Sequence, residues 1–191
     1  MRQRGNGMGR PLTRFLLDDH RRLDALLRSV VADPLKVDQP EYNQCRAGLL
    51  RHIGMEEKIL LPAAQRLSGG QSLAIAAKLR RDHAALASLL MPTPTASIIT
   101  TIRAILADHN ALEEGPGGLY EICDDLVGQE TDQLVTSPCA APEVAVMPHS
   151  DGPTVVNALQ RALERAGYNL IEDQTAGEKL KVLPNEKEVS T

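Results

Sequence analysis

The sequence predicts an all-α fold, an up-down-up-down four-helix bundle followed by a linker and one short extra helix. Apolar residues recur at three-to-four spacing in four successive stretches, as on the buried face of an amphipathic helix. Proline or glycine follows each stretch, and both residues end helices. Aromatic residues form only 2 % of a chain that is 42 % hydrophobic, so the core is aliphatic, which suits helix-on-helix packing.

The four helices are expected at residues 12–32, 40–67, 71–91 and 95–114. Thr13 is a suitable N-cap for the first helix, and Pro34 ends it because a residue before proline avoids helical geometry. The inward stripes are, in chain order, Leu16, His20, Leu23, Leu27 and Val30; Cys45, Leu49, His52, Glu56 and Ile59; Ala76, Leu79, His83, Leu86 and Leu90; and Ile98, Ile102, Ile105, His109 and Leu112. Residues 115–118, Gly-Pro-Gly-Gly, break the fourth helix, which resumes over 119–127 in a bent line.

The chain therefore divides into a bundle at 12–128, a linker at 129–153, and a short helix with a polar tail at 154–191. The linker is rich in Pro, Ala, Ser and Thr and lacks periodicity. Leu159 and Leu163 mark the apolar face of the short helix, which Gly167 ends. The sequence leaves open whether this helix docks on the bundle or on a second copy of the chain, which would make a homodimer.

Charge and composition exclude some classes of partner. The formal net charge of -4 and the pI near 5.7 give no general attraction to nucleic acid or to an anionic membrane. No run of about 18 apolar residues is present, so no membrane span is expected. Cys45, Cys123 and Cys139 form no close-spaced pair, which is typical of reduced thiols. We therefore expect a cytoplasmic protein.

Each predicted helix of the bundle carries one histidine on its apolar stripe: His20, His52, His83 and His109. A single core histidine is most often bonded to the backbone. Residues counted from the helix ends, at about 1.5 Å each, give the depth of each histidine in the bundle. The depths of successive histidines differ by roughly 0, 5 and 9 Å, so the four can meet in one layer. Four imidazoles buried at one depth lose hydration, at a cost of roughly several kcal/mol, unless something binds them. Bundle cores hold metal ions in this way.

Two glutamates project into the same layer. Glu56 and Glu113 each follow a histidine by four residues, which is one helical turn. Glu113 lies about 40° around the helix from its histidine and Glu114 about 140° away. Glu113 is therefore the expected ligand, although a bend at Gly115 could turn Glu114 inward. The same rotation turns Glu57 outward.

Four aspartates lie close to the histidines in sequence. Asp24 is one turn after His20, and we expect it at the rim of the layer, with a third carboxylate ligand as the alternative. Asp19, Asp82 and Asp108 each precede a histidine and point about 100° away from it. We expect these three side chains in solvent.

The number of ligands indicates two metal ions. Four imidazoles and two carboxylates exceed the positions of a tetrahedral zinc site. If each glutamate bridges, two octahedral ions receive about eight protein bonds and keep about four positions for other ligands. A nitrogen and oxygen set of this kind suits iron or manganese, and no cysteine is expected near the layer.

These motifs resemble those of the hemerythrin-like family, also called HHE cation-binding domains. The matching elements are Asp-Asp-His20, His52-x-x-x-Glu56-Glu57, Asp-His83 and Asp-His109-x-x-x-Glu113-Glu114. The resemblance covers residues 12–127 and implies a bundle around two iron ions joined by an oxo or hydroxo bridge. The metal ligands that it implies, with both glutamates as bridges, are His20, His52, Glu56, His83, His109 and Glu113.

The chain departs from oxygen-carrying hemerythrins at two points. Ala87 stands where they have a fifth histidine, and the fourth helix carries His-x3-Glu instead of His-x4-Asp. The chain resembles instead a bacterial branch with His, His-x3-Glu, His and His-x3-Glu. That resemblance implies a di-iron protein that binds or reduces a small oxidant (O2, peroxide or NO), with the oxidant entering near Ala87. The alternative is an iron- or oxygen-responsive sensor, or an iron-handling protein, that signals through the C-terminal segment. Whether the chain is an enzyme stays open.

Overall fold

The computed structural model describes residues 11–30, 37–127 and 144–171. These residues are helical where they are regular, and none of them forms a strand. The helices are α1 (Pro11–Ser29), α2 (Gln39–Met55), the π-helical turn η1 (Glu56–Leu60), α3 (Leu61–Leu67), α4 (Ala76–Leu89), α5 (Ala96–Glu114), α6 (Leu119–Val127) and α8 (Pro153–Ala166). The all-α prediction is confirmed. Pro34, expected to end the first helix, lies outside the described residues.

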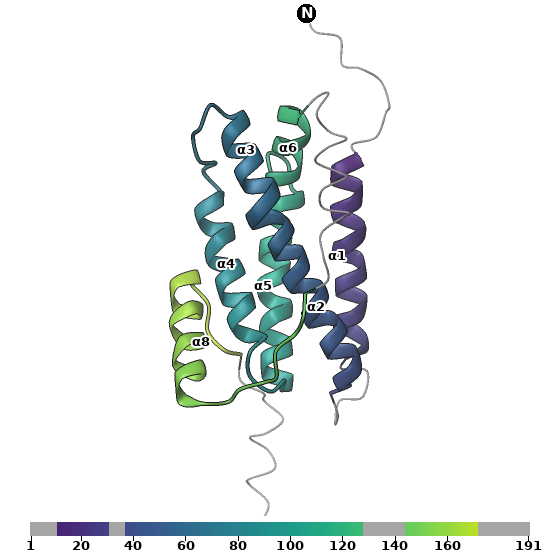
Figure 1. The fold of residues 1–191 in the computed structure, drawn as a ribbon, viewed down its shortest axis with the longest axis vertical. Helices are drawn as coiled ribbons and strands as arrows, with labels where there is room; N and C mark the ends of the chain where they lie inside the picture. The colour runs from purple at the N-terminus through teal and green to yellow at the C-terminus, as the bar shows by residue number, and fades with distance from the viewer. Residues whose placement is uncertain (1–10, 31–36, 128–143, 172–191) are drawn as a thin grey trace, which may run out of the picture.

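Four helical rods stand side by side and alternate in direction (Figure 1). In that view α1 runs down, α2, η1 and α3 rise as one rod, α4 runs down, and α5 rises. Packing joins α1 to α2, α4 to α5, and α5 back to α1. The short helix α6 follows α5 and packs on α1 and α3 at the upper end of the bundle. This is the predicted up-down-up-down order.

The second rod contains the π-helical turn η1, which apolar periodicity alone does not reveal. The backbone N–H of Leu61 donates to the carbonyl of Glu56, five residues back. Pro62 accounts for the wider turn, because proline lacks an N–H and its ring displaces the carbonyl four residues earlier. The extra residue rotates the inward face, so Leu60 is fully buried and Ile59, the expected core residue, is only half-buried.

The expected N-cap of the first helix and the expected start of the third helix are wrong. α1 begins before Thr13, whose hydroxyl donates to Asp124 of α6 instead of capping the helix. α4 begins at Ala76 rather than at Gln71. The expected start of α5 is confirmed, because the side chain of Thr95 accepts a backbone N–H of the first turn.

The buried apolar side chains form two clusters, one on each side of the level at which the four histidines lie. Those of the first cluster include Leu23, Leu27, Leu49, Leu86, Leu89, Ile102 and Ile105. Those of the second include Leu12, Leu16, Leu60, Leu61, Leu79 and Leu119. Along α1, for example, His20 lies between Leu16 of the second cluster and Leu23 of the first. The polar layer is therefore enclosed by aliphatic packing above and below.

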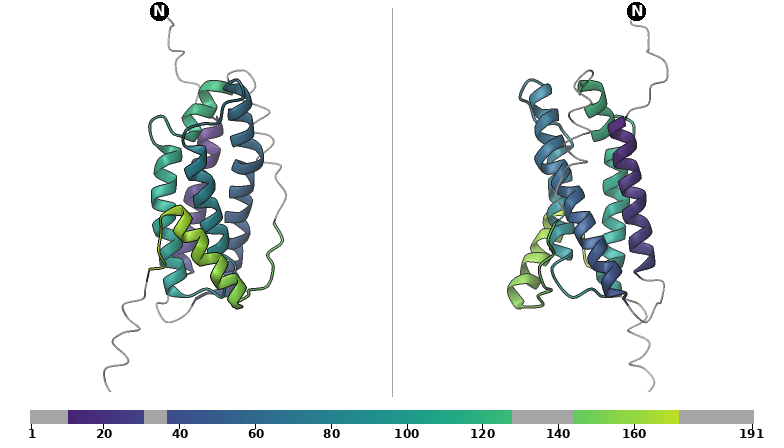
Figure 2. Two further views of the ribbon diagram at one scale, coloured as in Figure 1. Left: turned by 90° about the vertical axis from the view of Figure 1, so that its left-hand side faces the viewer. Right: turned by 45° about the vertical axis from the view of Figure 1, so that its right-hand side comes forward.

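The short helix α8 docks on α4 of its own chain, which answers the question that the sequence left open. Figure 2 shows α8 lying against the outside of the bundle from two further directions. Leu159 and Leu163 are buried in this contact, and Gly167 ends the helix in a left-handed conformation (φ 87°). Before α8, the chain is tied to the connection between α4 and α5, where Asp151 accepts hydrogen bonds from the backbone N–H and the hydroxyl of Thr93. None of the described helices is both long and apolar enough to cross a membrane.

Candidate metal centre

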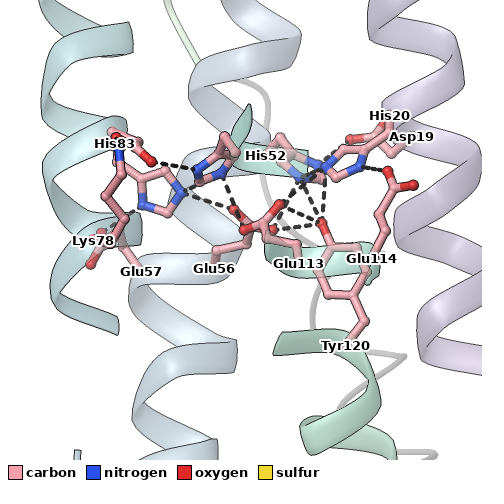
Figure 3. Close-up of polar contacts among 12 residues, drawn as sticks. Asp19, His20, His52, Glu56, Glu57, Lys78, His83, Glu113, Glu114 and Tyr120 are labelled. Atoms are coloured by element: carbon pink, nitrogen blue, oxygen red, sulfur yellow. Dashed lines mark hydrogen bonds and ion pairs between the residues drawn. The ribbon is translucent and has the colours of Figure 1, made fainter. Parts of the chain in front are cut away.

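The four histidines predicted to share one level do meet in one layer. They come from α1, α2, α4 and α5, and all four are buried. Glu56, from η1, and Glu113, from α5, are fully buried beneath them (Figure 3). The Nε2 atoms form two pairs, His20 with His52 at 2.8 Å and His83 with His109 at 3.2 Å.

Each glutamate directs one oxygen toward each pair of histidines. Glu56 Oε1 lies 3.2 Å from His52 Nε2, and Glu56 Oε2 lies 3.1 Å from His83 Nε2. Glu113 Oε1 lies 3.2 Å from His109 Nε2, and Glu113 Oε2 lies 3.5 Å from His20 Nε2. The layer therefore contains two groups of four residues whose ligand atoms lie within 4.8 Å of one another, His20, His52, Glu56 and Glu113, and Glu56, His83, His109 and Glu113. Both carboxylates are common to the two groups.

A carboxylate also faces the outer nitrogen of each imidazole. His20 Nδ1 lies 2.6 Å from Glu114 and His52 Nδ1 lies 2.9 Å from Asp19. His83 Nδ1 lies 2.7 Å from Glu57, and His109 Nδ1 lies 3.5 Å from Asp82. A carboxylate at Nδ1 keeps the proton on that nitrogen and leaves the Nε2 lone pair for a metal ion. The Nε2 lone pairs of His20, His52 and His83 then point into the layer, whereas the 3.5 Å between His109 Nδ1 and Asp82 Oδ2 leaves both atoms without a hydrogen bond among the described residues.

These contacts correct the predictions for Glu57, Asp19 and Asp82. Glu57 does leave the inner face of its own helix, as expected, but its side chain reaches across to α4, where it contacts His83. Asp19 and Asp82 are buried, not in solvent, because each faces a histidine of the neighbouring helix. The rotation of a residue about its own helix axis cannot show such contacts between helices.

The other carboxylates fall outside the layer. Glu114 contacts the outer nitrogen of His20 and contributes no atom to either group. Asp24 is half-exposed and pairs with Arg28, so it is not a third carboxylate of the layer. Asp108 is exposed, as expected.

The donor set fits a cation. Glu113 Oε1 is buried and has no hydrogen-bond partner among the described residues, although His109 Nε2 lies only 3.2 Å away. A buried carboxylate oxygen without a partner is costly, and an ion bound by both atoms removes that cost. The facing Nε2 atoms lead to the same conclusion, since two lone pairs 2.8 Å apart repel each other unless a proton or a metal ion lies between them.

A comparison with protein families also indicates a cation-binding domain. The family model described as hemerythrin HHE cation binding domain matches residues 12–121. The chain belongs to the hemerythrin family. Searches of curated proteins and of solved structures found no match. The family match covers α1 to the start of α6, and therefore every residue of the layer.

The hemerythrin layer contains one residue that the sequence analysis missed. The hydroxyl of Tyr120, from α6, lies 2.8 Å from Glu56 Oε1 and 3.1 Å from Glu113 Oε2. The turn before α6 brings it there, because the chain folds back against the end of α5 at Gly118, where a Cβ atom would lie 2.5 Å from the carbonyl oxygen of Glu113. The four-residue break in the sequence was visible, but the direction in which it sends Tyr120 is set by this close backbone approach.

Burial and neighbouring charge oppose each other at the histidines. Burial lowers the pKa of His52, but Glu56 and Asp19 favour the charged imidazolium and raise this pKa to about 10. The same balance raises the pKa of His109 to about 10. Burial and the charge of Glu56 raise the pKa of Glu113. Protons therefore neutralise part of the layer's negative charge, and a metal ion has to displace them.

A cavity of about 440 Å³ gives access to the layer from the side of the first apolar cluster. Three of the four histidines line this cavity: His20, His52 and His109. The other lining residues include the apolar Leu27, Leu49 and Leu86 and the polar Asp24, Arg103 and Asn110. Ala87 is not among the residues that line this cavity, so the expected entrance beside it stays a prediction. On α4 it is Leu86, fully buried, that faces the cavity.

Proposed function

We propose that this hemerythrin domain is a non-haem di-iron protein that binds or reduces a small oxidant such as O2, peroxide or NO. One ion would be held by His20, His52, Glu56 and Glu113, and the other by Glu56, His83, His109 and Glu113. The observation that carries the proposal is the pair of buried ligand groups that share both carboxylates. Each shared carboxylate points one oxygen at each histidine pair, which is the arrangement a bridging ligand needs.

The chemistry of the donors suits iron or manganese, and we propose iron. Imidazole and carboxylate suit iron, whereas thiolates would favour zinc or copper. The two described cysteines, Cys45 and Cys123, are buried in the apolar clusters, and neither is part of a ligand group. Iron would supply the change of oxidation state that binding or reducing an oxidant requires. Both thiols are free, which is consistent with the reducing cytoplasm that we propose as the location.

The protein itself would contribute three properties to this reaction. The carboxylates at the outer nitrogens hold the imidazoles of His20, His52 and His83 in one tautomer and one orientation. The packing of the bundle buries Glu56 and Glu113 fully, away from bulk solvent. The cavity lined by His20, His52 and His109 leads to the layer and has room for a small oxidant.

Elemental analysis and absorption spectroscopy test the proposal. Protein purified without chelators is expected to contain two irons per chain and to absorb in the near ultraviolet by charge transfer to iron. Adding peroxide or NO should change that absorption. Protein that contains one zinc ion and no iron would refute the proposal.

A second candidate function is an iron- or oxygen-responsive sensor that signals through the C-terminal segment. The observation that favours it is a chain of contacts from the layer to α8. Asp82 lies 3.5 Å from His109 Nδ1 and accepts a hydrogen bond from Lys78 at 2.5 Å. Lys78 also donates to the carbonyl of Ala166, at the end of α8, at 3.3 Å and to the hydroxyl of Tyr168 at 3.0 Å.

Hydrogen exchange tests this second function. If a metal ion draws His109 toward the layer, its contact with Asp82 changes, and Lys78 passes that change to α8. Amide exchange over residues 153–168 should therefore differ between the iron-free and iron-loaded proteins, and Lys78→Met should remove the difference. Identical exchange in the two states of the unmodified protein would exclude signalling by this route.

A further inference from the structure

The hydroxyl of Tyr120 contacts both histidines of one ligand group and neither histidine of the other group among the described contacts. It lies 2.9 Å from His20 Nε2 and 3.4 Å from His52 Nε2. It also lies 2.8 Å from Glu56 Oε1 and 3.1 Å from Glu113 Oε2. These are the four residues of the first group. No such contact joins Tyr120 to the histidines of the second group within the described structure.

Hydrogen bonding alone cannot account for this arrangement in the form that binds metal. Ligation requires neutral imidazoles, and with Nδ1 protonated both Nε2 atoms are acceptors. Both carboxylates are acceptors as well. The hydroxyl of Tyr120 has one proton, so it can donate to only one of the four surrounding atoms. A metal ion at their centre would bind all of them, together with the phenol oxygen.

The distances outline a five-coordinate site. Bonds of about 2.1 Å that meet at right angles place neighbouring ligand atoms about 3 Å apart. Around the first group, the atoms of neighbouring ligands are separated by 2.8, 3.2 and 3.5 Å. The hydroxyl of Tyr120 lies 2.8 to 3.4 Å from all four atoms. The oxygen of Tyr120 and the four ligand atoms are therefore spaced as five ligands of one metal ion would be.

The surroundings of Tyr120 hold it in this position. Its side chain is almost fully buried, and Leu119 and Cys123 on the same helix are buried in the second apolar cluster. The hydrogen bond between Thr13 and Asp124 ties α6 to α1. Tyr120 belongs to α6, which lies at the upper end of the bundle in Figure 1, and it does not line the cavity, so it leaves the oxidant's route free.

We propose that Tyr120 is a fifth protein ligand of the metal ion held by His20, His52, Glu56 and Glu113, and that it binds as a phenolate. On loading, the O–H bond breaks, a metal–oxygen bond forms, and the proton passes to solvent. The first ion would then have five protein ligands and the second ion four. This inference rests on the proposed function insofar as it requires iron in the layer.

Resonance Raman and visible absorption spectroscopy of the full-length iron(III) protein test the assignment. A phenolate bound to iron(III) gives a visible charge-transfer band, and excitation in that band enhances the ring vibrations of the phenolate. Tyr120→Phe removes only the hydroxyl, so it is expected to abolish the band and these vibrations. Tyr42→Phe is the matched control, because Tyr42 is equally buried but lies in the other apolar cluster. This control should keep the full signal.

The outcomes separate this inference from the proposed function. Two irons per chain without phenolate vibrations in the unmodified protein would overturn the assignment of Tyr120 and leave the di-iron proposal standing. A signal that persists in Tyr120→Phe would also overturn it. Protein that binds no iron would refute the proposed function and this inference with it. The spectrum of the unmodified protein decides the question even if Tyr120→Phe does not fold.

Discussion

Asp19 offers a sharp test, because the sequence places it in solvent and the structure places it against His52. Its Oδ2 atom lies 2.9 Å from His52 Nδ1, and its Oδ1 atom accepts a hydrogen bond from Arg22 at 2.8 Å. Asp19→Asn keeps the shape but removes the charge, and its one amide oxygen can serve only one of these donors. Losing such a partner behind a metal-binding histidine lowers metal affinity by about 10–100-fold, or about 1.4–2.7 kcal/mol. We therefore expect this loss of iron affinity in Asp19→Asn.

Asp18→Asn provides the matched control. Asp18 is the preceding residue, and its ion pair with Arg21 is exposed to solvent on both sides. Exposed pairs of this kind contribute little, so iron affinity should stay within about twofold of the unmodified protein. Anaerobic titration of the iron-free protein with iron(II), in competition with a coloured chelator, measures both affinities. Equal affinities in Asp19→Asn and Asp18→Asn would refute the role given to the carboxylate at Nδ1.

Three further predictions concern the bridge, the protons and the docked helix. Glu56→Gln removes one of the two carboxylate charges that both groups share. Elemental analysis should therefore show that two-metal loading is lost in this variant, while circular dichroism shows that the helices are retained. The raised pKa values of His52 and His109, each about 10, mean that protons compete with the metal below that pH. Iron affinity should therefore fall as the pH falls, by about tenfold per pH unit for each displaced proton, and an affinity independent of pH would contradict this. Leu163→Ala in the buried face of α8 should lower the free energy of unfolding by about 2–3 kcal/mol, whereas the exposed Val156→Ala should change it by less than about 0.5 kcal/mol, as denaturant titrations would show.

The sequence predicted the bundle and the six residues that the layer brings together, and the reason is helical periodicity. A histidine on the apolar stripe of a helix has to face the core, and a glutamate four residues later has to share its direction. Neither inference needs knowledge of the neighbouring helix. The same logic placed Glu113, rather than Glu114, inside.

Contacts between helices were beyond that logic. Glu57 and Asp19 leave the inner face of their own helices, as rotation predicts, yet each meets a histidine of the next helix. Tyr120 depends on the close backbone approach at Gly118, which the residue order does not specify. The π-helical turn η1 depends on Pro62 and on packing, and its extra residue rotates the inward face of the helix. Regular periodicity therefore predicted the burial of Ile59 wrongly.

Anomalous diffraction at the iron absorption edge, from crystals of the iron-loaded protein, is the most direct test of the central claim. It is expected to show two iron positions in the layer, one beside His20 and His52 and the other beside His83 and His109, with Glu56 and Glu113 between them. A single position, or iron bound elsewhere in the chain, would contradict the claim that the two carboxylates bridge a pair of metal ions.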